Sequence, residues 1–190
     1  ATLGYSFSKF QYWGRDLFLG FVLLIITLPY VIYLIPIYIM QSRFDLIDTR
    51  LGLILPYIAT NLPMSVFIMR GQFNGVPNEM MEAARIDGAS ELYTFHRIAI
   101  PIMSPGIATM SIMGFIGGWN AYLLPMIILN KNEKFTLPVM MATLRASTDI
   151  TANQGAIYLA VAISVIPILL VFAFFSKYII SSISAGAVKE

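Results

Sequence analysis

A short polar segment near the middle of the chain reads Glu82-Ala83-Ala84-Arg85-Ile86-Asp87-Gly88. It is followed by Ile98 and Pro101, and uncharged stretches of membrane-spanning length lie on both sides of it, at residues 51–69 and 98–130. Side chains that face lipid have no means of binding a soluble protein. The sequence therefore predicts a docking element held between two membrane spans.

Composition places most of the chain in a membrane. Of its 190 residues, 58% are hydrophobic and 12% are charged, and the mean hydropathy is +0.77. A hydrocarbon core of about 30 Å takes about 20 apolar residues of helix, and four uncharged stretches meet that length: residues 17–40, 51–69, 98–130 and 155–176. The predicted fold is all-α, a polytopic helical bundle in contact with membrane lipid. The formal charge of +2 is small and scattered, so no nucleic-acid partner is expected.

The stretch at residues 98–130 is longer than one straight span needs. We expect an oblique entry helix before Pro101, a span from about Pro105 to Gly118, and a bent section around Trp119-Asn120 and Pro125. Prolines also lie inside the other stretches, where each removes a backbone donor and favours a kink. These are Pro29, Pro36, Pro56, Pro63 and Pro167.

The polar segment is expected to form a short helix over residues 79–87. Asn78 is the expected N-cap, and Gly88 is expected to end the helix, because glycine adopts the left-handed conformation without steric cost. Ser90 can cap a second helix that runs toward Pro101. One face of the first helix carries small alanines, which let another protein approach the backbone closely. That face comprises Met80, Ala83, Ala84 and Asp87.

The spacing of this segment resembles the EAA loop of permease subunits in ABC importers. Three residues separate Glu82-Ala83-Ala84 from Gly88, nine separate Gly88 from Ile98, and Ile100, where that pattern usually has leucine, precedes Pro101. The flanking sequences are similar to the carbohydrate-uptake branch, in particular to the second permease subunit of maltose-type transporters. They are Val76-Pro77-Asn78-Glu79, Gly118-Trp119-Asn120 and Ala185-Gly186-Ala187-Val188-Lys189.

The resemblance implies the type I importer permease fold in the bacterial cytoplasmic (inner) membrane. Residues 1–190 would form one multi-pass permease domain, with four spans in a fragment of a six-span protein, since the chain starts without Met on what resembles the end of a family helix. Residues 74–101 would form a cytoplasmic coupling loop, and residues 181–190 a cytoplasmic tail. A small excess of Lys and Arg on that side favours the same orientation.

The resemblance also implies partners: a cytoplasmic ABC ATPase dimer, a second permease subunit and an extracytoplasmic solute-binding protein. The loop would dock in a groove of the ATPase through Glu82, Ala83, Ala84, Arg85, Asp87, Gly88, Ile98 and Pro101. The tail would reach the ATPase through Gly186, Ala187, Val188 and Lys189. The alternatives are an ordinary solvated loop helix and a frayed terminus.

Neutral polar groups within the apolar stretches are candidates for a solute path, because they cost free energy against lipid and usually face the bundle interior. Amides and hydroxyls can hydrogen-bond an uncharged polyhydroxylated solute, and an aromatic ring can stack on a sugar. The alternative is that Ser and Thr bond their own helix carbonyls and that Trp lies at the membrane interface. The candidates are Thr60, Asn61, Ser65, Ser111, Trp119 and Asn120.

The favoured function is a permease subunit of an ATP-driven importer for sugars or related polyols, working by alternating access. The chain has no Gly-Lys-Ser/Thr phosphate loop, so ATP hydrolysis would belong to the partner ATPase and this subunit would be non-catalytic. With no Cys and one His, we expect no metal site and no cofactor. The alternative is a secondary transporter or channel, which should carry ionisable residues or a selectivity motif in its spans.

Overall fold

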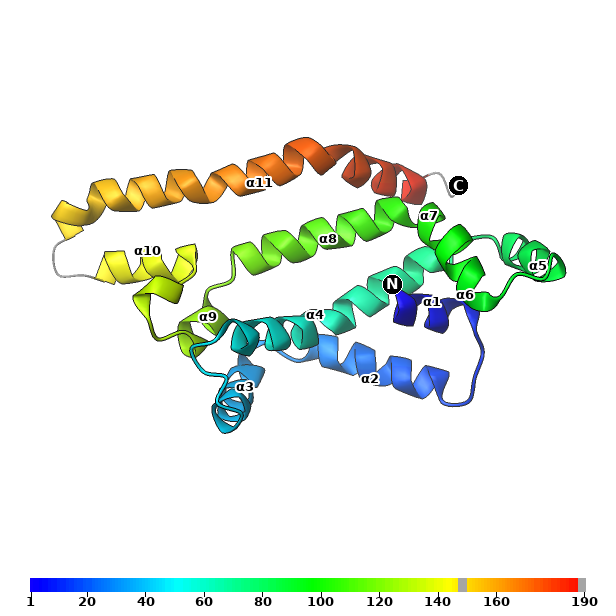
Figure 1. Cartoon of the computed structure of the whole chain (residues 1–190), viewed down its shortest axis with the longest axis horizontal. Helices are drawn as coiled ribbons and strands as arrows, with labels where there is room; N and C mark the ends of the chain where they lie inside the picture. Colours follow the sequence, from blue (N-terminus) through cyan, green and yellow to red (C-terminus); the bar gives the residue numbers. More distant parts are fainter. Residues whose placement is uncertain (147–149, 188–190) are drawn as a thin grey trace. The chain divides into compact units, whose positions relative to one another are not determined.

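The computed structural model describes residues 1–146 and 150–187, and within them the regular structure is helical without a β-strand (Figure 1). In chain order the elements are α1 (Thr2–Lys9), α2 (Arg15–Thr27), α3 (Val31–Arg43), α4 (Arg50–Phe73), α5 (Asn78–Ile86), α6 (Glu91–Thr94), the π-helix η1 (Phe95–Ala99), α7 (Ile100–Ile102), α8 (Ser104–Trp119), α9 (Leu123–Ile128), the 3-10 helix η2 (Asn132–Lys134), α10 (Leu137–Ala146) and α11 (Ile150–Ala187). The all-α prediction is confirmed.

Two helices of the described part are long and apolar enough to cross a membrane, Arg50–Phe73 and Gln154–Phe175. The number rises to as many as four if each of two broken pairs, α2 with α3 and α6–α7 with α8, is one span. The apolar stretch predicted at residues 17–40 is thus not one continuous helix. It is interrupted at residues 28–30, where Pro29 has no amide hydrogen to donate to the helical ladder.

The long stretch after the polar segment is divided as the sequence predicts. Helices α6, η1 and α7 form the entry section, which meets α8 at a bend of 74°. Helix α8 covers the span predicted from about Pro105 to Gly118 and is long enough to cross a membrane only together with the entry section, and α9 follows a break at residues 120–122. Pro101 is the second residue of α7, after the π turn, and its missing amide hydrogen removes one bond from the helical ladder just before the bend.

The helices group into two compact units. The first comprises residues 1–28, 61–113 and 175–190. Its main core is aromatic: the Tyr5 ring lies 5.5 Å from the Phe73 ring and 4.9 Å from the Phe95 ring, centroid to centroid. Met69, Val76, Met81 and Ala99 complete this buried cluster. Gly4 lets α1 approach α4, because a Cβ there would stand 2.6 Å from the Cβ of Met69.

The second unit comprises residues 29–60 and 114–174, with a buried cluster of Leu34, Leu124, Ile128 and Leu129. Next to it, Asp48 joins the turn after α3 to the segment after α9. Its amide donates to the Ile128 carbonyl at 2.8 Å, and its Oδ1 accepts from the amides of Asn130 (3.0 Å) and Lys131 (3.2 Å). The Lys134 ammonium donates to Asp48 Oδ2 at 2.7 Å. The hydrogen bonds from Lys134 and the Asn130 amide lower the pKa of Asp48 to about 2.

This arrangement predicts a stability difference with a defined pH dependence. The pKa of Asp48 is lower in the folded chain than its usual 3.8. The charged Asp48 therefore contributes fully to folding stability above about pH 4, and this contribution is lost as the pH falls through about 2. Asp48→Asn should lower the unfolding temperature at pH 7, and the gap from the wild type should close between pH 4 and pH 2. Asn tolerates the positive φ of 60° at this position, so the change tests the charge.

Intrinsic fluorescence of the purified protein in detergent, followed on heating, measures both effects. Asp45→Asn is the matched control, because Asp45 is a neighbouring exposed aspartate with a similar φ of 54°. This account of Asp48 would be contradicted if both variants lowered the unfolding temperature equally. It would also be contradicted if the difference in unfolding temperature between Asp48→Asn and the wild type did not change with pH.

Candidate functional site

Helix α5 begins one residue earlier than the sequence predicts. Asn78 is its first residue and Pro77 occupies the cap position, without a side-chain cap. The predicted capping role of Asn78 is therefore wrong, for a physical reason that lies elsewhere in the chain. The Asn78 side-chain oxygen accepts a hydrogen bond from the Lys9 ammonium at 2.8 Å, and this bond fixes the side chain away from the helix amides.

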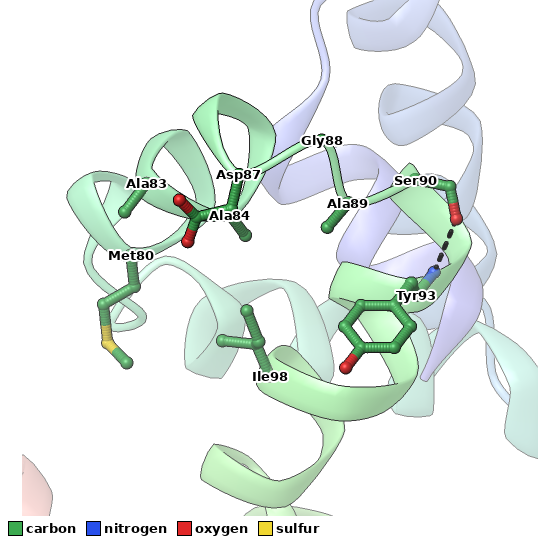
Figure 2. Close-up of a pocket in the computed structure, with 9 residues that line it drawn as sticks. All are labelled: Met80, Ala83, Ala84, Asp87, Gly88, Ala89, Ser90, Tyr93 and Ile98. Atoms are coloured by element: carbon green, nitrogen blue, oxygen red, sulfur yellow. Dashed lines mark hydrogen bonds between the residues drawn. The ribbon is translucent and has the colours of Figure 1, made fainter.

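The end of α5 agrees with the prediction. Gly88 has a φ of 81°, in the left-handed region. The Ala89 amide reaches back to the Ala84 carbonyl at 2.9 Å, and the Gly88 amide donates to the Arg85 carbonyl at 3.0 Å. This pair of bonds is the glycine-terminated Schellman motif. Ser90 then caps α6, with its hydroxyl oxygen accepting from the Tyr93 amide at 3.3 Å, as predicted (Figure 2).

A pocket of about 770 Å³ lies between α5 and the α6–η1 segment. Figure 2 shows Ile98 rising from η1 toward α5, with Tyr93 beside it. The lining brings together five predicted site residues, Ala83, Ala84, Asp87, Gly88 and Ile98, with Met80, Ala89, Ser90 and Tyr93. Three other predicted residues, Glu82, Arg85 and Pro101, are exposed and lie outside this lining.

An ion pair joins α5 to α6. Arg85 Nε donates to Glu91 Oε1 at 2.6 Å, and about half of each side chain is exposed. The hydrogen bond and the charge of Glu91 raise the pKa of Arg85 above its already high value. Arg85 therefore binds within its own chain. Three exposed carboxylates remain on the segment, those of Glu79, Glu82 and Asp87.

The same segment exposes large apolar side chains that the sequence-based site did not include. Ile86 is 85% exposed in the polar loop between α4 and α6, and Leu92 is 68% exposed at the start of α6. Tyr93 and Met80 add further exposed apolar area beside them. Apolar residues inside a polar loop could have identified this surface, but the face that each would occupy depends on how α5 and α6 pack.

The candidate solute-path residues mostly satisfy their own helices. Four of them bond a carbonyl one turn earlier, at 2.8–2.9 Å: Thr60 to Pro56, Ser65 to Asn61, Ser111 to Ile107 and Asn120 to Ile116. Trp119 is different, since its indole N–H donates to the Ser164 carbonyl at 3.0 Å and its ring stacks on Phe115 at 5.8 Å. Asn61, Ser65 and Ser111 belong to the first unit, and Thr60, Trp119 and Asn120 to the second.

The predicted tail contacts lie at the end of α11. No proline interrupts residues 168–187, and the helix continues to Ala187, so Gly186 and Ala187 are helical residues. Val188 and Lys189 lie outside the described residues.

The chain is similar to several curated transport proteins. It is 35% identical over 189 residues to the arabinooligosaccharides transport system permease protein AraQ of Halalkalibacterium halodurans. This alignment covers 100% of this chain and 66% of that protein. It is 34% identical over 186 residues to the diacetylchitobiose uptake system permease protein NgcG of Streptomyces coelicolor (98% and 62%). It is 30% identical over 189 residues to the trehalose transport system permease protein SugB of Mycobacterium tuberculosis (100% and 69%). The chain thus spans about two thirds of the length of these relatives.

A solved structure agrees in fold. It is the crystal structure of a bacterial ABC transporter involved in the import of the acidic polysaccharide alginate, and it aligns with a TM-score of 0.77 at 24% identity. The alignment covers 92% of this chain and 65% of that one. Residues 1–185 also match the family described as "Binding-protein-dependent transport system inner membrane component". With this match over nearly its whole length, the chain belongs to the family of inner membrane permease components of binding-protein-dependent transport systems.

Proposed function

We propose that this chain is the permease subunit of an ATP-driven sugar importer in the bacterial inner membrane and that residues 74–101 are the site where a cytoplasmic ATPase dimer docks. A second permease subunit and an extracytoplasmic solute-binding protein complete the assembly. One observation carries the docking site: Ile86 is 85% exposed in the polar loop between α4 and α6, and Leu92 is 68% exposed at the start of α6. Lipid does not cover a polar loop, so a protein surface is the natural cover for these side chains.

The chemistry of the segment fits such a partner. The pocket beside Ala83 and Ala84 can receive a protruding side chain, because the alanines keep the backbone of α5 accessible. The carboxylates of Glu79, Glu82 and Asp87 favour basic groups on the ATPase around this apolar centre. Arg85 contributes indirectly, since its bond to Glu91 fixes the angle between α5 and α6.

A displacement of α5 can be transmitted to the membrane helices through one buried cluster. Met81 of α5 is buried against Phe95 of η1 and Phe73 of α4 in one cluster. Packed cores resist deformation, so α5, η1 and the end of α4 move together. Pro101 and the bend of 74° then connect this cluster to α8, where a change of angle would open or close the path.

The solute class is proposed to be neutral sugars. The three relatives compared above are named for transport of arabinooligosaccharides, diacetylchitobiose and trehalose. The apolar stretches of this chain contain no charged side chain, which suits an uncharged solute. Asn120 and the stacked pair of Trp119 and Phe115 offer an amide and an aromatic face for such a solute. The C-terminal residues Gly186 to Lys189 are proposed to contact the ATPase.

The first test addresses the end of the docking helix. Gly88→Leu forces a branched side chain into the left-handed region, which costs about 1–2 kcal/mol and tilts α5. We expect membrane insertion to be normal. Stimulation of ATP hydrolysis by the solute-binding protein and a mixture of the three named sugars should fall at least about fivefold. Gly88→Asn is the control, because Asn tolerates this conformation and should retain most of the stimulation. Normal coupling in Gly88→Leu would contradict the proposal.

The second test addresses the exposed apolar surface. Ile86→Asp places a charge where the proposal puts an apolar contact, so the ATPase should no longer co-purify with the permease pair. The Ile86 side chain is 85% exposed, and the folding of the subunit should therefore be unaffected. Ile86→Leu keeps the apolar contact and should keep the ATPase. Equal retention of the ATPase by both variants would mean that this surface is not the docking site.

The third test addresses the path. Asn120→Ala removes an exposed amide from the end of α8, and loss of one solute hydrogen bond of about 1 kcal/mol raises KM about fivefold. Uptake of radiolabelled trehalose, diacetylchitobiose or arabinooligosaccharide by vesicles containing the complete transporter measures this constant. Basal ATP hydrolysis should stay unchanged. An unchanged KM for the transported sugar would remove Asn120 from the path.

A further inference from the structure

The turn that leads into the docking helix is held by the end of α1. The Lys9 ammonium donates to the Val76 carbonyl at 2.6 Å and to Asn78 Oδ1 at 2.8 Å. One residue earlier, the Ser8 hydroxyl donates to Asn74 Oδ1 at 2.7 Å. Two consecutive residues of α1 thus bind two residues of the segment that joins α4 to α5 and the first residue of α5.

The position of Lys9 needs a physical explanation. The N-terminus of a helix carries partial positive charge, so an ammonium group beside the start of α5 is electrostatically unfavourable. Burial also lowers the pKa of Lys9, an effect that the carboxylate of Glu79 partly offsets. The two hydrogen bonds compensate for these costs, and both go to the entry of α5. A neutral apolar residue would avoid the costs but leave the Val76 carbonyl without its lysine partner.

The contact continues into the buried core. Val76 is 2% exposed and packs in the same cluster as Tyr5 of α1 and Met81 of α5. The Tyr5 hydroxyl lies 4.0 Å from the Met81 sulfur. Helix α1 therefore contacts both the entry turn and the inner face of the docking helix.

We propose that Lys9, assisted by Ser8, is a positioning residue for energy coupling. Its hydrogen bonds hold the entry of α5 against α1. A displacement of the docking helix then moves α1 as well, instead of only bending residues 74–77. This inference rests on the proposed docking of an ATPase at α5. It assigns a role to α1, which lies 65 residues or more before the docking loop in the sequence.

The test uses the full-length chain assembled with its ATPase, second permease and solute-binding protein in lipid vesicles. Lys9→Met keeps the length of the side chain and removes its charge and hydrogen bonds. We expect the ATPase to stay bound and basal hydrolysis to stay normal. Stimulation by the binding protein with trehalose, diacetylchitobiose and arabinooligosaccharide should fall at least about fivefold. Lys9→Arg should keep the stimulation. Arg15→Met is the matched control, because Arg15 is a nearby cation that binds Asp16 instead of the entry turn.

A covalent substitute makes the test specific. Residues 1–190 contain no cysteine, so Ser8→Cys with Asn74→Cys introduces a single pair within them, at a contact that already exists. In the Lys9→Met background, oxidation of this pair should restore stimulation, and reduction should abolish it again. A purely structural role for Lys9 would instead lower the yield of the complex and basal hydrolysis together, and that result would overturn the proposal.

Gly88→Leu, measured in parallel, separates the two proposals. Full stimulation in Lys9→Met together with loss in Gly88→Leu overturns the role of Lys9 and leaves the docking site standing. Full stimulation in both variants overturns both. A wild-type complex that the binding protein and these sugars do not stimulate also overturns both, because the importer function itself then fails.

Discussion

The hydrocarbon core of a bilayer offers no hydrogen-bond partner to a peptide group, and the described apolar stretches of this chain meet that constraint by being mostly helical. Backbone groups in the apolar stretches are satisfied within helices. The breaks at residues 28–30 and near Pro101 coincide with prolines, whereas Pro36, Pro56, Pro63 and Pro167 lie inside continuous helices. The short polar segments are consequently the parts of the chain that can expose polar groups to a partner, because the spans must bury theirs.

The proposed docking segment, residues 74–101, can act on the membrane helices only if the packing beneath α5 is rigid. The rings of Tyr5, Phe73 and Phe95 provide this base, because they come from three elements far apart in the sequence and pack within 6.5 Å of one another. The half-exposed ion pair between Arg85 and Glu91 connects α5 to α6 beside this core. The buried apolar core makes the base of α5 stiff, and the ion pair fixes the direction of α5 relative to α6.

Local features of the site could be predicted from the sequence, and long-range ones could not. Gly88 and Ser90 act through backbone groups within five residues of themselves, so their roles follow from local spacing. The side chain of Asn78 was misassigned because its partner, Lys9, lies 69 residues away. The Asp48 contact with Lys134 spans 86 residues and has no local pattern at all. The exposure of Ile86 likewise depends on which face of α5 the aromatic core occupies.

The π turn at Phe95–Ala99 bears on how such chains can vary. The Ile100 amide bonds the carbonyl of Phe95, five residues back, so this stretch accommodates one residue more than an α-helical turn would. Each residue of an α-helix corresponds to a rotation of about 100°. Removing one residue from a regular helix would turn its flanks by about that angle, but the wider π turn already takes up one extra residue. Deleting a single residue here would therefore restore α-helical hydrogen bonds and largely keep the direction of α5 relative to α8. This stretch can therefore lose one residue at a position other than Ile98 and keep both the residues and the direction of the proposed docking surface.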